Sequence, residues 1–158
     1  MTTPQPAKIR LFSLLADEAA QLRGFVDLLA QEERLLVDGQ TDALVSLAQR
    51  KTEQYRKLQR LNDDRLRLLA QMGLPATDAS IRKLCGTEAG ADAPWEKVLE
   101  LARDAQARNA RNGRLITEHM QHNQAALSTL LAAANQPQLY GADGQSRPTG
   151  GGRKLGSA

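Results

Sequence analysis

Hydrophobic positions recur every three or four residues along three long stretches of this chain, and short polar or glycine-containing breaks separate them. This spacing predicts amphipathic α-helices over about residues 7–37, 42–72 and 95–135. A shorter stretch of the same kind, from Asp78 to Cys85 with Thr77 as its predicted N-cap, lies between the second and third. The pattern therefore predicts three long helices and one short linking helix.

The first break predicts a tight turn between two long helices. Gly39 can adopt the left-handed conformation that ends a helix, and Thr41 or Asp42 can cap the helix that follows. Gly73 and Pro75 end the second helix. So short a connection places the first two helices antiparallel and adjacent, as an α-hairpin.

The third helix is predicted to begin with Asp92 as its cap and Pro94 in its first turn, where proline is tolerated. At 1.5 Å per residue, about 40 residues span roughly 60 Å, enough to lie along the whole hairpin. The predicted fold is all-α: a long antiparallel α-hairpin with a third long helix packed along it, as an elongated helical bundle or coiled coil.

The two ends of the chain differ from this helical region. Residues 1–6 contain two prolines and are expected to form a flexible leader, and residues 7–140 form the helical domain. Residues 141–158 hold half of the twelve glycines of the chain. A segment with so few large apolar side chains does not offset its ordering entropy, so we expect a disordered Gly-rich C-terminal tail.

Amides interrupt the apolar face of the third helix at Asn109, Asn112 and Asn123, where a bundle core would carry leucine. A buried amide without a partner costs about 1–3 kcal/mol. Two interpretations are therefore open. The amides pair with polar groups inside the bundle, or this face is not permanently buried and forms a binding surface.

Composition and charge narrow the function classes. The 21 basic and 18 acidic residues alternate along the helices and produce no broad positive field, so nucleic-acid binding is not predicted. No apolar run reaches the roughly 20 residues that cross a bilayer, and no secretory signal begins the chain. The single cysteine excludes an intramolecular disulfide. We expect a cytoplasmic protein without membrane insertion.

The candidate reactive residues do not predict an enzyme. His119 and His122 stand three apart on a helix, but no third ligand lies near them in the sequence, so no metal is expected. Cys85 is expected to be a buried structural thiol. The glycines before Arg153 lack the flanking strand and helix of a phosphate loop. We expect no catalytic residues and no cofactor.

Two segments carry a family resemblance. Residues 109–116 read Asn-Ala-Arg-Asn-Gly-Arg-Leu-Ile, and residues 140–144 read Tyr-Gly-Ala-Asp-Gly. Together with the breaks at Asp38-Gly39 and Met72-Gly73, they resemble the FlgN family of flagellar type III export chaperones over about residues 10–145. The resemblance implies a small helical protein that binds the C-terminal regions of hook-associated proteins 1 and 3. It also implies that the protein prevents these hook-associated proteins from assembling prematurely and delivers them to the export gate.

The resemblance and the amide-broken face together predict two sites on this chain. The predicted export-gate contact is Leu139 with Tyr140. An alternative is a coiled-coil adaptor or structural homodimer, which has no export role and is permanently paired through the same face. The predicted cargo-binding residues are Asn109, Asn112, Leu115, Ile116, Asn123, Leu127, Leu130 and Leu131.

Overall fold

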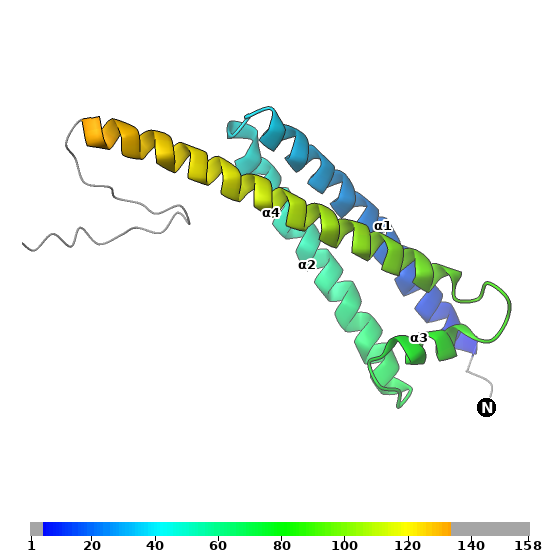
Figure 1. Cartoon of the computed structure of the whole chain (residues 1–158). Helices are drawn as coiled ribbons and strands as arrows, with labels where there is room; N and C mark the ends of the chain where they lie inside the picture. The colour runs from blue at the N-terminus through cyan, green and yellow to red at the C-terminus, as the bar shows by residue number, and fades with distance from the viewer. Residues whose placement is uncertain (1–4, 134–158) are drawn as a thin grey trace, which may run out of the picture. The chain divides into compact units, whose positions relative to one another are not determined.

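A computed structural model describes residues 5–133, and every regular element in that range is a helix (Figure 1). The elements are α1 (Gln5–Val37), α2 (Asp42–Gln71), α3 (Asp78–Cys85) and α4 (Ala93–Ala133). The predicted all-α fold is confirmed, with helix ends within two residues of expectation. Gln5 and Pro6 of the predicted leader belong to α1, and the rest of the predicted leader lies outside the described residues. The predicted tail lies outside the described residues.

The chain divides into two compact units between Asn112 and Gly113, inside α4. The first unit contains α1, α2, α3 and α4 up to Asn112. The described part of the second unit is the remainder of α4. Each unit is considered by itself below.

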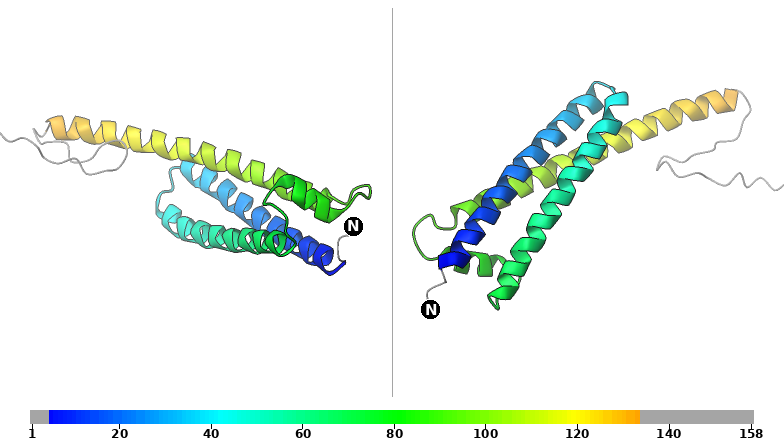
Figure 2. Two further views of the ribbon diagram at one scale, coloured as in Figure 1. Left: turned by 90° about the horizontal axis from the view of Figure 1, so that it is seen from below. Right: turned by 180° about the vertical axis from the view of Figure 1, so that it is seen from behind.

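The first unit is built on the predicted α-hairpin of α1 and α2, which lie side by side in Figures 1 and 2. Gly39 has a φ of +68°, and the Gln40 N–H donates to the Leu35 carbonyl at 2.9 Å, which ends α1. Thr41 has helical dihedrals and makes no side-chain cap, so α2 begins at Asp42 without one. The chain therefore reverses on the glycine rather than on a threonine cap.

Helix α3 closes the end of the unit where α2 finishes. Gly73 has a φ of +66°, and the Thr77 hydroxyl accepts a hydrogen bond from the Ser80 N–H at 3.2 Å, the predicted cap. The buried side chains of α3 join the core cluster of α1 and α2. They are Ile81, Leu84 and Cys85.

The first part of α4 runs parallel to α1 and antiparallel to α2. Near the start of α4, Trp95 belongs to the same core cluster as Leu11 of α1. Further along α4, Ala105 packs with Phe25 and Leu29 of α1. The order of these contacts fixes the direction of α4, and the first unit consists of three long helices closed by α3 at one end.

A buried polar cluster links the helices of this unit. Glu18 of α1 and Arg65 of α2 form an ion pair at 3.4 Å, and both side chains are about nine-tenths buried. The Arg65 guanidinium also lies 4.8 Å from the ring centroid of Trp95, whose Nε1–H donates to Asp78 at 2.6 Å. Burial raises the pKa of the Glu18 carboxyl, and the Arg65 charge opposes that shift. One chain of contacts thus joins α1, α2, α4 and α3.

Candidate protein-binding surfaces

One face of α4 carries the apolar stripe along the whole helix, but its burial changes along the way. At 100° per residue, residues 98, 105, 112, 116, 123, 127 and 130 share this face. Val98, Ala105 and Asn112 are buried. In the second unit the same face is open: Ile116 is 37% exposed, Leu127 38% and Leu130 68%. Exposed apolar residues on one helical face are typical of a protein-binding surface.

Asn112 is the last residue of the first unit, and its side chain is fully buried there. Its Nδ2 donates to the Leu29 carbonyl at 2.8 Å and to Glu32 Oε2 at 2.9 Å, both on α1. Because both partners are acceptors, the amide orientation is settled. The Asn112 amide is therefore bonded within the fold, and its predicted contact with cargo stays a prediction.

Charges on both sides of this amide strengthen the joint between α1 and α4. Lys51 of α2 donates to both oxygens of Glu32, at 3.1 and 3.3 Å, so the buried carboxylate has a cation as well as an amide. Arg111, next to Asn112, pairs with Glu33 at 2.9 Å. A buried carboxylate needs such partners to offset its desolvation.

The remaining predicted cargo residues lie on α4 with their side chains outside the core. Asn109 and Asn123 are exposed, and Leu115 is half-buried. Leu131 lies within α4, but its side chain is outside the part that the structure describes. Leu139 and Tyr140, the predicted gate contact, also lie outside the described residues.

The first unit contains a groove that the sequence did not predict. It has a volume of about 590 Å³ and lies between α2 and α4, with α1 as its floor. Tyr55 of α2 borders this groove and is 54% exposed. The feature of the sequence that could have predicted this groove is the set of alanines on α2 and α4, whose small side chains leave the space open: Ala48, Ala102 and Ala105. The lining residues are Leu22, Phe25, Glu32, Ala48, Lys51, Thr52, Tyr55, Leu58, Ala102, Ala105, Gln106 and Asn109.

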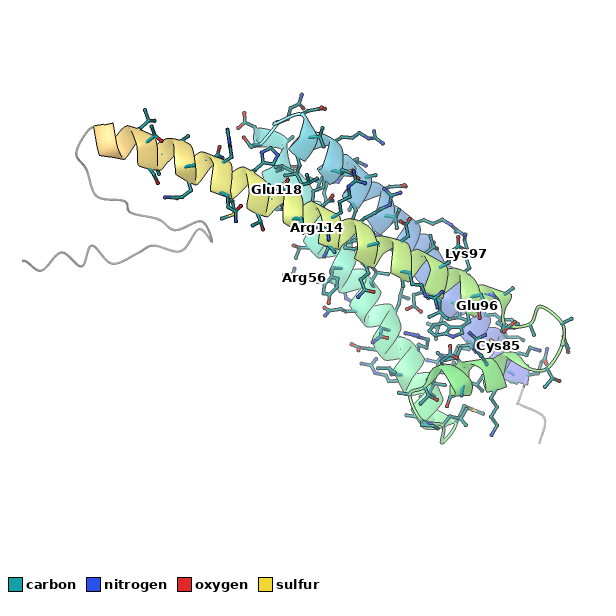
Figure 3. The ribbon with its side chains drawn as sticks, viewed as in Figure 1. Arg56, Cys85, Glu96, Lys97, Arg114 and Glu118 are labelled. Carbon is teal, nitrogen blue, oxygen red and sulfur yellow. The ribbon has the colours of Figure 1, made fainter. Side chains whose placement is uncertain are left out.

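The remaining candidate reactive residues are Cys85, His119 and His122. Cys85, labelled in Figure 3, is fully buried on α3, and burial raises the pKa of its thiol, with Asp92 adding to the shift. His119 is half-buried and His122 is exposed. Residues 5–133 contain no group of three or more potential metal-ligating side chains. Nor does any helix in this range have the length and hydropathy to cross a membrane.

Comparison with known proteins shows the family of this chain. The family model described as "FlgN protein" matches residues 1–148. A flagella synthesis protein FlgN of Yersinia enterocolitica is 29% identical over 150 residues, covering 93% of this chain and 97% of that protein. The flagella synthesis protein FlgN of the serotype O:8 / biotype 1B strain has the same identity and coverage. No solved structure matches. The chain belongs to the FlgN protein family.

Proposed function

We propose that this protein is a cytoplasmic, non-enzymatic chaperone of flagellar type III export. It binds the C-terminal regions of hook-associated proteins 1 and 3, prevents their premature assembly and delivers them to the export gate. Family membership supports the flagellar role, since the similar Yersinia proteins are flagella synthesis proteins. The choice of cargo rests on the family resemblance of residues 109–116 and 140–144.

The observation that carries the proposal is the exposed apolar face of α4 in the second unit. Ile116, Leu127 and Leu130 share this face with Asn123. A cargo helix can lay its own apolar side on such a face, while the amide pairs with polar groups and fixes the register. Leu139 and Tyr140, beyond Pro137, are proposed to contact the export gate, because a tyrosine supplies a large amphipathic anchor at low entropic cost.

The cargo proposal is tested by co-purification with each hook-associated protein, in full length and without its C-terminal region. We expect the full-length cargo to be retained and the truncated cargo to be lost. Replacing Leu127 by Asp should abolish retention, whereas Ala125→Asp, an exposed position on the opposite face of α4, should not. Equal retention of truncated and full-length cargo would contradict the proposal.

The gate contact is tested separately by Tyr140→Ala. This variant should keep its cargo and lose binding to the gate protein, measured by pull-down with the purified soluble domain of that protein. Loss of cargo and gate binding together would show instead that Tyr140 supports the fold.

The rival function is a permanent homodimer paired through the same face and without an export role. Its prediction is a dimer at all concentrations, with residues 116–130 protected from amide exchange in the absence of cargo. Sedimentation velocity over a hundredfold range of concentration distinguishes it from the chaperone, whose α4 face becomes protected only when cargo is added.

A further inference from the structure

The exposed face of α4 is a small surface for holding a cargo protein. The exposed parts of Ile116, Leu127 and Leu130 add up to about one and a half side chains. Full burial of a large apolar side chain contributes about 1.5–3 kcal/mol, whereas micromolar binding requires about 8 kcal/mol. Further contacts would add to the affinity, and the groove of the first unit, with a volume of about 590 Å³, is a hollow that could supply them.

The groove has the shape and chemistry of a seat for one helix. Its α2 wall runs from Ala48 to Leu58, about 15 Å, and its α4 wall from Ala102 to Asn109, about 10 Å. Phe25 of α1 lies at the floor between them. Walls of this length fit two to three turns of a partner's helix, whose small and medium apolar side chains would point to the floor.

Tyr55 provides the anchor in this groove. Its ring is 54% exposed although it borders an apolar hollow, and the described residues give it no hydrogen bond. Tyrosine is enriched among residues that dominate binding energy, because its ring buries a large area with few rotatable bonds.

The two ends of the groove differ, which gives an occupant a direction. At one end lie Glu32 and Lys51, which pair with each other, and Asn109. The other end is formed by apolar side chains, Leu58 and Ala102 among them. An apolar groove with hydrogen-bonding groups at only one end fixes both the register and the polarity of a bound helix.

A positive charge beside the groove, that of Arg56, indicates which charge the bound helix would carry. Arg56 follows Tyr55 on α2, is exposed, and forms no ion pair with any described residue (Figure 3). Within the lining the charges of Glu32 and Lys51 cancel, and Arg56 is an unpaired charge beside the groove. A carboxylate on the bound helix would complement it.

We propose that this groove binds a second, amphipathic helix of the exported cargo, with a narrow apolar face and an acidic residue opposite Arg56. The inference rests on the proposed chaperone function and adds a second contact to the α4 face. Because the groove and the open face of α4 would each hold a different segment, the two contacts act as linked sites, and the affinity exceeds that of either one.

The test uses the full-length chaperone and the purified C-terminal region of a hook-associated protein, with affinity measured by isothermal titration calorimetry. Tyr55→Ala and Arg56→Glu should each weaken binding by about tenfold or more, as expected for an anchor and a charge contact. The matched control is Lys57→Glu, the same charge change one residue later. Lys57 borders a different hollow beside Asp17 of α1, and its replacement should leave the affinity within about threefold of wild type.

Each outcome is decisive. Unchanged affinity for both groove variants, with binding abolished by Leu127→Asp, would overturn the groove proposal and leave the chaperone function standing. Absence of binding by the wild-type protein would overturn both. If Tyr55→Ala unfolds, Arg56→Glu carries the test, since that exposed side chain supports no contact in the fold. A wild-type dimer that Tyr55→Ala converts to a monomer would assign the groove to self-association and refute the cargo helix.

Discussion

Replacing Asn112 by Ala should destabilise the first unit by about 2 kcal/mol. The substitution removes the hydrogen bond to the Leu29 carbonyl, contributing about 0.5–1.5 kcal/mol, and the bond to the Glu32 carboxylate, contributing about 1.5–3 kcal/mol. It also removes Oδ1, a buried acceptor without a partner whose burial costs about 1–3 kcal/mol. The loss outweighs the relief, because two bonds are broken and one orphan atom is removed.

The assay is urea unfolding followed by circular dichroism at 222 nm. With a slope of about 2 kcal/mol per molar urea, the midpoint should fall by about 1 M. Asn109→Ala is the matched control, because it is the same change one turn earlier at an exposed position, and it should shift stability by less than about 0.5 kcal/mol.

A third variant separates hydrogen bonding from side-chain volume. Asn112→Asp keeps the shape of the side chain but replaces the donor with an acceptor facing the Glu32 carboxylate and the Leu29 carbonyl. It should destabilise at least as much as Asn112→Ala. Equal midpoints for the wild-type, Asn112→Ala and Asn112→Asp proteins would refute the assignment of this amide to the fold.

Three further predictions concern the rest of the fold. Burial raises the pKa of Glu18, so its charged form is disfavoured in the folded state. The free energy of unfolding of Glu18→Gln, relative to that of the wild type, should therefore rise as the pH increases above about 4.5 and then level off. Urea unfolding across pH 4–8 measures this difference. Trp95→Phe loses the bond to Asp78 and part of the stacking with a guanidinium, and should lower the free energy of unfolding by about 1–3 kcal/mol, whereas an unchanged midpoint would contradict this role. Gly113→Ala should stabilise α4 by about 0.5–1 kcal/mol, because its new Cβ meets no atom within 4 Å. Gly24→Ala should gain less stability, because its Cβ would lie 3.0 Å from the side-chain Nε2 of Gln54 on α2. Equal gains in stability for the two variants would refute this close contact.

The fold was largely predictable because its boundaries depend on local signals. Gly39 and Gly73 adopt positive φ where the pattern breaks, and Thr77 caps α3 as expected. These choices depend on residues within a few positions of one another, which a sequence displays directly. The short connection after Gly39 then required the antiparallel hairpin.

The site was less predictable because it depends on distant partners. Asn109, Asn112 and Asn123 share one face of α4 and look equivalent in the sequence. Only Asn112 is buried, because the fold brings it against two acceptors on α1. These acceptors lie 83 and 80 residues earlier in the chain, so the sequence around Asn112 does not reveal them. Tyr55 also fits the apolar pattern of α2, yet the facing helices carry small residues there, and its ring stays half exposed.

The central claim is that the open face of α4 is a cargo seat, and hydrogen exchange with and without cargo tests it most directly. In the free protein we expect slow exchange over the buried part of α4 up to Asn112 and fast exchange over residues 113–130. Adding the C-terminal region of a hook-associated protein should slow exchange over residues 113–130. Exchange in that segment that is already slow without cargo, or that stays fast with saturating cargo, would contradict the account.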